Sequence, residues 1–178
     1  MKGIVFCEFL DMVSEKFSED MVDDIIEAAD LPSGGAYTTV GTYDHSEMVA
    51  MVQALSDRTG APVHLLVQTF GHHMFGRFFH LYPHFFGGVD TALDFLERIE
   101  RVIHVEVLKL YPDAQLPRFD ITRGADGSMV MVYRSPRRMG DLAAGLIEGC
   151  IEHYGQPVSV ARRAMPDGSD EFTLRTTR

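Results

Sequence analysis

The chain has 178 residues, of which 46% are hydrophobic and 24% charged, and its net charge is −10. This composition excludes a disordered tail, a collagen and a mucin-like stalk, and the length fits one domain or at most two small ones. With 16 basic residues against 26 acidic ones, the chain is also poorly suited to nucleic acid, whose binding depends on neutralised phosphates.

The net charge is concentrated in the first third of the chain. Residues 1–57 contain 12 acidic and two basic side chains, whereas residues 58–178 contain 14 of each. Two interpretations are open: a solvated face that aids solubility, or an acidic docking surface for a basic partner.

The two cysteines, Cys7 and Cys150, form neither a CxxC pair nor a metal-binding spacing, which predicts reduced thiols. The chain does not open with a basic segment followed by an apolar run, as a signal peptide would. No apolar stretch approaches the ~18 residues of a membrane span. We therefore expect a soluble protein of the cytoplasm.

The first part of the chain predicts helices over 2–16, 18–30, 45–58, 62–80 and 91–110. Ser18 and Asp90 are the expected N-caps of the second and fifth helices. Asp44 with Glu47 three residues later resembles a capping box for the third. Pro112 is expected to stop the fifth.

After Pro117 the pattern changes to short β-rich segments. Strands are predicted at 118–123 and 128–134 around Asp126-Gly127, and at 157–164 and 170–177 around a second turn. A helix over 137–154 separates the two hairpins. Helices followed by a mainly antiparallel sheet predict an α+β fold, and the absence of βαβ alternation argues against a dinucleotide-binding fold.

Five of the eight histidines fall between residues 64 and 84. His80 and His84 have the i, i+4 spacing of a zinc motif, but Pro83 separates them and no Glu follows His80 as HExxH requires. His72 and His73 are adjacent and point in different directions on a helix. Polar histidines at the surface are the simpler interpretation, and a metal-dependent enzyme is the alternative.

His104 borders the apolar stripe of the helix predicted over 91–110. A histidine in that position is either satisfied at the edge of the core or is an axial ligand facing a flat apolar cofactor, because neutral imidazole binds iron well. The residues alone leave both possibilities open.

The segment 133–138 is the next unusual string. If 128–134 is a strand, Tyr133, Ser135 and Arg137 alternate onto one side. A phenol, a hydroxyl and a guanidinium that converge can clamp carboxylates. The alternative is a serine that caps the following helix, with arginines at the surface.

Together these motifs resemble the heme-nitric oxide/oxygen binding (H-NOX) family, which is related to the heme domain of soluble guanylate cyclase. The resemblance covers essentially the whole chain as a single domain. It rests on the opening Met1–Val5, His104, Leu116-Pro117-Arg118, the YxSxR signature at 133–137 and the run 145–149. It implies a helical distal part, about 1–60, and a proximal part, about 61–178, with heme between them.

The resemblance also implies the roles of individual residues. It implies one b-type heme per chain, with His104 as the axial ligand of the iron. It places the heme propionates on Tyr133, Ser135 and Arg137. It further implies that Val5 and Pro117 press the porphyrin out of plane.

The resemblance maps the distal pocket onto Phe9, Met74, Phe78, Leu142 and Leu146, which are all apolar. Family members that hold oxygen resemble one another in a distal Tyr, and that position is Leu142 here. Without a hydrogen-bond donor, bound oxygen is not stabilised, so the family pattern implies selectivity for nitric oxide, with carbon monoxide also bound. Whether His72 or His73 enters this pocket depends on the helix register.

The implied function is a non-catalytic bacterial gas sensor. In the family pattern, nitric oxide breaks the bond between His104 and iron, the heme flattens, and the distal part rotates against the proximal part. The resemblance implies a histidine kinase or a cyclic-di-GMP enzyme as a separate signalling partner. An oxygen-binding or heme-carrier protein is the alternative.

Overall fold

The computed structural model describes residues 1–177. Its elements follow the order α1 (Gly3–Lys16), α2 (Glu19–Ala29), α3 (His45–Thr59), α4 (Val63–Leu81), η1 (Pro83–Phe86), α5 (Ala92–Glu97), η2 (Ile99–Ile103), α6 (His104–Leu110), β1 (Arg118–Arg123), β2 (Met129–Arg134), α7 (Gly140–Tyr154), β3 (Val158–Ala164) and β4 (Asp170–Thr176). Helices followed by an antiparallel sheet confirm the predicted α+β class.

The four strands form one antiparallel sheet in the order β1-β2-β4-β3. Each predicted hairpin is present, and β2 joins the two hairpins by pairing with β4. Residues Met129, Met131 and Tyr133 of β2 alternate inward, where they pack with α5 and α7. The sheet thus has one face covered by helices, as an α+β fold requires.

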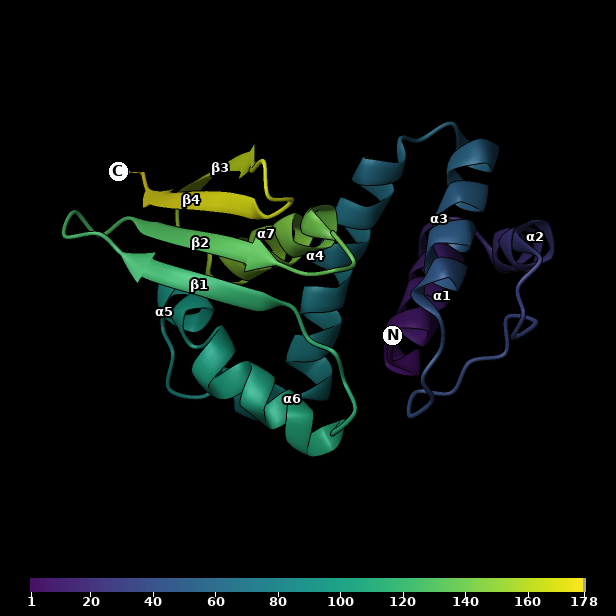
Figure 1. Ribbon diagram of the computed structural model, residues 1–178, viewed down its shortest axis with the longest axis horizontal. Helices are drawn as coiled ribbons and strands as arrows, with labels where there is room; N and C mark the ends of the chain where they lie inside the picture. Colours follow the sequence, from purple (N-terminus) through teal and green to yellow (C-terminus); the bar gives the residue numbers. More distant parts are fainter. Residues whose placement is uncertain (178) are drawn as a thin grey trace.

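Two hydrophobic cores lie on either side of α4. In Figure 1, α1, α2 and α3 lie on one side of this helix, and the sheet lies on the other. Leu66, Phe70 and Met74 of α4 belong to the core formed with α1–α3, whereas Phe75 belongs to the core formed with the sheet, α5 and α7. Because both cores share α4, this helix joins the two halves of the molecule.

Small residues allow α4 and α7 to cross closely. A Cβ atom on Gly145 would clash with the carbonyl oxygen of Gln68, and one on Gly71 would clash with that of Leu142. The close approach requires glycine at both positions. This close crossing sets the distance between α4 and α7, which lie side by side in the structure.

The helix predicted over 91–110 is divided in the structure. A short α5 is followed by the π-helical turn η2, in which the N–H of Ile103 bonds to the carbonyl of Arg98 five residues earlier. A π turn inserts one residue into the helical repeat and rotates everything that follows. The amphipathic periodicity continues across this turn, so the sequence pattern predicts one uninterrupted helix.

The expected N-cap at Ser18 is confirmed, because its hydroxyl accepts the N–H of Met21. The cap expected at Asp90 differs. Thr91, not Asp90, caps α5, because its hydroxyl accepts from the N–H of Asp94.

The predicted capping box is only half formed. Asp44 caps α3 by accepting from the Ser46 N–H at 2.8 Å. Glu47 does not complete the box, since its buried carboxylate instead accepts from the hydroxyls of Ser33 and Tyr37.

The helix predicted to start at 137 begins at Gly140, because the chain makes a turn through Arg138, whose φ is 49°.

Candidate functional site

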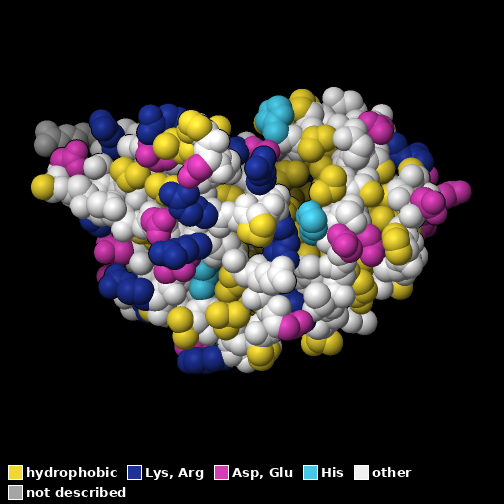
Figure 2. Space-filling model, viewed as in Figure 1, with side chains coloured by type: hydrophobic (Ala, Val, Ile, Leu, Met, Phe, Trp, Pro, Cys, Tyr) yellow, Lys and Arg dark blue, Asp and Glu magenta, His cyan; other side chains and the backbone are white. Residues whose placement is uncertain are grey.

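A cavity of about 630 Å³ opens between the two halves of the molecule. It lies within the range of roughly 300–1,000 Å³ that is usual for cofactor and ligand sites. Its walls come from α1, α4, η1, α5, η2, α6, the segment 111–117, the end of β2 and α7. Figure 2 shows the hollow in the surface, with hydrophobic side chains inside it.

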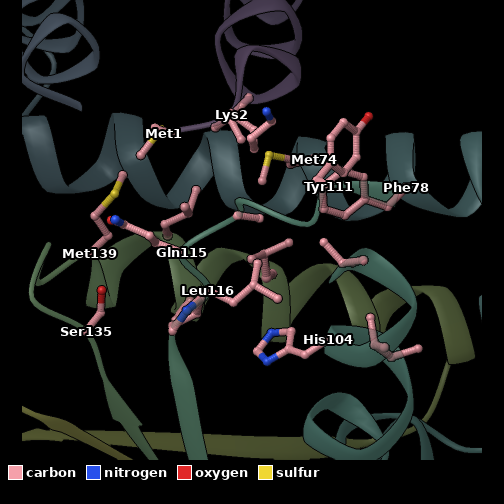
Figure 3. A pocket seen from close by; sticks show the side chains of 18 of the residues that line it. Met1, Lys2, Met74, Phe78, His104, Tyr111, Gln115, Leu116, Ser135 and Met139 are labelled. Carbon is pink, nitrogen blue, oxygen red and sulfur yellow. The ribbon is translucent and has the colours of Figure 1, made fainter. Parts of the chain in front are cut away.

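His104 points from the start of α6 into this cavity (Figure 3). Its Nδ1 atom is 3.0 Å from Oε1 of Glu100, and its side chain is 15% exposed. Burial lowers the pKa of His104 and outweighs the opposing effect of Glu100, so the ring is held neutral. Within residues 1–177, no protein group bonds to Nε2, which leaves a lone pair free to bind a metal.

The π turn explains how His104 reaches this position. In an unbroken helix His104 borders the apolar stripe, whereas in the structure it lines the cavity together with Ile99, Ile103 and Val107 of that stripe. No motif in the sequence marks Glu100 as part of the site. Its position four residues before His104 was the signal, since that spacing places two side chains on one helical face.

Tyr133, Ser135 and Arg137 meet at one end of the cavity. Only Tyr133 lies in the strand, where it is buried, and burial raises the pKa of its phenol. The Ser135 hydroxyl accepts the N–H of Arg137, and the Arg137 guanidinium donates to the backbone and side-chain oxygens of Gln115 at 2.7 and 3.0 Å. The strand predicted over 128–134 is present and ends at Arg134, and the turn that follows places all three groups on the cavity wall.

Ser135 is not the cap of the next helix. Helix α7 starts after Met139, which makes no side-chain capping bond. This outcome removes the capping alternative that the sequence left open. Gln115, which the sequence analysis missed, holds Arg137 at the edge of the cavity.

The part of the cavity wall that α4 and α7 supply is apolar. Ten of the eleven predicted site residues line the cavity, including Val5, Pro117, Met74, Phe78, Leu142 and Leu146. The exception is Phe9, which is fully buried behind this wall, with its ring centroid 5.3 Å from that of Phe70. Phe9 therefore belongs to the core that α4 forms with α1–α3, and its predicted place in the distal pocket is wrong.

His72 and His73 lie outside the cavity and line a smaller groove with Lys16 and Glu148. His72 Nε2 is 2.6 Å from a carboxylate oxygen of Glu152. Across the residues that the structure describes, no group of three or more His, Cys, Asp and Glu side chains could hold a metal ion. Nor does that part of the chain contain a helix long and apolar enough to cross a membrane.

A polar contact crosses the mouth of the cavity. The Lys2 ammonium lies 3.1 Å from Asp113 and also donates to the Thr42 hydroxyl, which in turn donates to Asp113. Lys2 and Thr42 belong to the N-terminal half, whereas Asp113 lies between α6 and β1. Figure 3 shows Met1 and Lys2 on the wall opposite His104.

These donors fit a heme. A flat apolar ring system matches the apolar walls, the free Nε2 of His104 is an iron ligand, and Arg137 with its neighbouring hydroxyls suits the carboxylates of such a group. The site is therefore of the heme-binding type by the chemistry of its residues.

Comparison with known proteins agrees with this assignment. The Haem-NO-binding family matches residues 2–162. The unliganded Fe(II) H-NOX protein from K. algicida is 37% identical, with a TM-score of 0.92 over 100% of this chain and 97% of that one. The S. oneidensis H-NOX protein in the Fe(II)NO state is 25% identical, with a TM-score of 0.93 over all of both chains.

The IWP-051-bound, Fe(II)CO form of the H-NOX from Shewanella woodyi is 32% identical, with a TM-score of 0.84 over 99% of this chain and 95% of that one. A comparison with curated protein sequences gave no significant match. The chain belongs to the H-NOX family, whose members are heme-based gas-sensor domains.

Proposed function

We propose that this protein is a non-catalytic sensor that binds one b-type heme per chain and selects nitric oxide over oxygen. The observation that carries the proposal is His104, whose free Nε2 enters a large apolar cavity that has Arg137 at its edge. A heme bound there supplies a ferrous iron with one open position for a diatomic gas.

In this proposal different residues of the chain hold different parts of the cofactor. His104 binds the iron from α6, and Tyr133, Ser135 and Arg137 hold the propionates. Val5 and Pro117 lie on the cavity wall, from α1 and from the segment before β1, where they would press on a bound ring. Exclusion of water by the apolar wall strengthens each polar contact inside.

Selectivity rests on the apolar wall formed by Met74, Phe78, Leu142 and Leu146. A bound oxygen carries partial negative charge and needs a hydrogen-bond donor to be retained, whereas bound nitric oxide needs it less. Tyr82 and Tyr111 also line the cavity. Their hydroxyl oxygens lie 3.2 Å apart and are hydrogen-bonded to each other. The S. oneidensis relative in its Fe(II)NO state supports nitric oxide as the ligand.

The proposed signal is a change in how the two halves of the chain pack. With heme bound, His104 would tie α6 to the iron, and loss of that tie would relieve the pressure that Val5 and Pro117 would exert on the ring. The distal half, about residues 1–60, then rotates against the rest, so that two packings serve as two states. A separate signalling protein, a histidine kinase or a cyclic-di-GMP enzyme, reads the difference.

Replacement of His104 by Gly tests the proposal. The variant should lose heme, or should retain it only when free imidazole occupies the vacated space, and absorption spectroscopy of the purified protein measures both. His72→Ala is the matched control, since His72 faces the separate groove, and its spectrum should equal that of the wild type. An unchanged ferrous spectrum in His104→Gly without imidazole would mean that another residue binds the iron.

A further inference from the structure

The carboxylate of Glu100 is held between two elements beside the cavity histidine. Its Oε1 atom lies 3.0 Å from Nδ1 of His104 and accepts the backbone N–H of Phe119 at 2.8 Å. Glu100 belongs to the π turn η2, and Phe119 belongs to β1. The side chain of Glu100 is about one-third exposed, so its carboxylate meets the ring at the boundary of the buried wall.

We propose that Glu100 is a positioning residue that accepts the Nδ1 proton of His104 and thereby sets the strength of the bond from Nε2 to iron. A neutral imidazole has one N–H, and its donation to Glu100 leaves the Nε2 lone pair facing the cavity. The inference deepens the proposed function and rests on it, since it requires His104 to bind the iron.

The chemistry follows from the charge of the carboxylate. An anion that accepts the Nδ1 proton increases the electron density of the ring and makes Nε2 a stronger ligand. Contacts of this kind also fix the tautomer and the orientation of a metal-binding histidine. Glu100 therefore resists the release of His104, and so it sets how readily nitric oxide switches the protein.

The position of Glu100 also connects this bond to the fold. Phe119 follows Pro117 by two residues, and its ring lies 6.2 Å from that of His104. The same carboxylate thus restrains the histidine and the start of β1. A purely structural role, in which Glu100 only ties η2 to β1, is the competing explanation.

Glu100→Gln separates the two roles. The amide oxygen can still accept from Phe119, but the negative charge beside His104 is removed. Glu106→Gln is the matched control, because Glu106 lies on α6 and its carboxylate binds Lys109 at 2.6 Å.

The measurement is the iron–histidine stretching band of the ferrous, gas-free protein by resonance Raman spectroscopy. The band should shift to lower frequency in Glu100→Gln and stay unchanged in Glu106→Gln. Under nitric oxide, His104 should be released faster in Glu100→Gln than in the wild type or in Glu106→Gln. An identical band in all three proteins would overturn the proposal.

If Glu100→Gln fails to retain heme, the wild type decides the question. In its carbonmonoxy form, with ¹⁵N-labelled histidine, the Nδ1 proton of His104 should be strongly deshielded and slow to exchange. A rapidly exchanging proton would overturn the role of Glu100. A wild-type protein with no iron–histidine band would contradict the proposed function itself and would be distinguishable from failure of this inference.

Discussion

Arg137 uses part of its guanidinium for hydrogen bonds within the protein and leaves other N–H donors available to a ligand. Its guanidinium uses two of its five N–H groups on Gln115. Among residues 1–177 no side-chain or backbone acceptor bonds to its remaining donors, which can therefore bind a carboxylate. The residue is therefore oriented before any cofactor arrives, which reduces the entropy lost on binding.

Arg137→Ala should weaken heme binding by about 1.5–3 kcal/mol, the cost of losing a hydrogen bond to a charged group. Ser135→Ala should cost about 1 kcal/mol, as loss of a neutral hydrogen bond does. Transfer of heme to a competing apoprotein measures both affinities. Arg134→Ala is the control, because Arg134 pairs with Asp120 and Asp167 at the surface. Equal heme retention in Arg137→Ala and Arg134→Ala would contradict the clamp.

At the residue scale, the sequence predicted which residue types meet in the site and missed how they are supported. His104, Ser135 and Arg137 stand in a recognisable order along the chain. Glu100 and Gln115 support them through contacts that depend on the π turn and on the path of segment 111–117. Glu100 has a local signal in its spacing of four residues from His104, whereas Gln115 lies 22 residues from Arg137 and only the folded chain reveals that contact.

At the scale of elements, the crossing of α4 and α7 determines one wall of the cavity. Gly145→Ala should lower the free energy of unfolding by about 1–3 kcal/mol, because the added methyl group forces the two helices apart. Gly76→Ala is the matched control on α4, where a Cβ would meet open space. It should stabilise the helix by up to about 1 kcal/mol. Urea unfolding measures both, and equal stability of the two variants would refute the close-packing account.

His73, where α4 faces α1, makes stability depend on pH. Burial lowers its pKa and outweighs Glu15 and Glu8, which raise it, while Arg77 and Lys16 lower it further. The folded state therefore binds the proton less readily than the unfolded chain. The associated stability is present above the ordinary histidine pKa of about 6.5 and is lost as the pH falls below it.

His73→Gln should therefore lose less stability than the wild type when the pH is lowered from about 7.5 to 5.5, a range that spans this pKa. Urea unfolding of the heme-loaded protein at both values measures the difference. His80→Gln changes an exposed histidine of the same helix and should behave as the wild type. A wild-type pH dependence in His73→Gln would show that burial of His73 contributes nothing to it.

The hairpins were predictable because their turns are locally encoded. Asp126-Gly127 and the turn before β4 place glycine at positive φ, at 81° for Gly127 and 82° for Gly168. The π turn η2 was not predictable, since it is selected by packing of Ile99 and Ile103 against the cavity and the C-terminal core. Local signals thus located the strands, and tertiary contacts decided the helix that carries the site.

At the scale of the whole molecule, the acidic surface and the cavity lie in different regions. Acidic side chains gather at the end of the molecule that carries α2, whereas most Lys and Arg side chains in this view lie over the sheet (Figure 2). The cavity lies between these ends, and α4 takes part in both cores. Helices α1 and α4 therefore connect the cavity to the acidic end of the molecule.

The most direct test of heme binding and of selectivity for nitric oxide is an optical titration of separate anaerobic samples of the ferrous, heme-loaded protein, one with carbon monoxide, one with nitric oxide and one with oxygen. We expect a five-coordinate, histidine-ligated spectrum before gas is added, because His104 supplies the single protein ligand. Carbon monoxide and nitric oxide should each change the spectrum, and oxygen should give no stable complex in a pocket lined by Met74, Phe78, Leu142 and Leu146. A stable oxy spectrum in air would contradict selectivity for nitric oxide, and purified protein that takes up no heme would contradict the account as a whole.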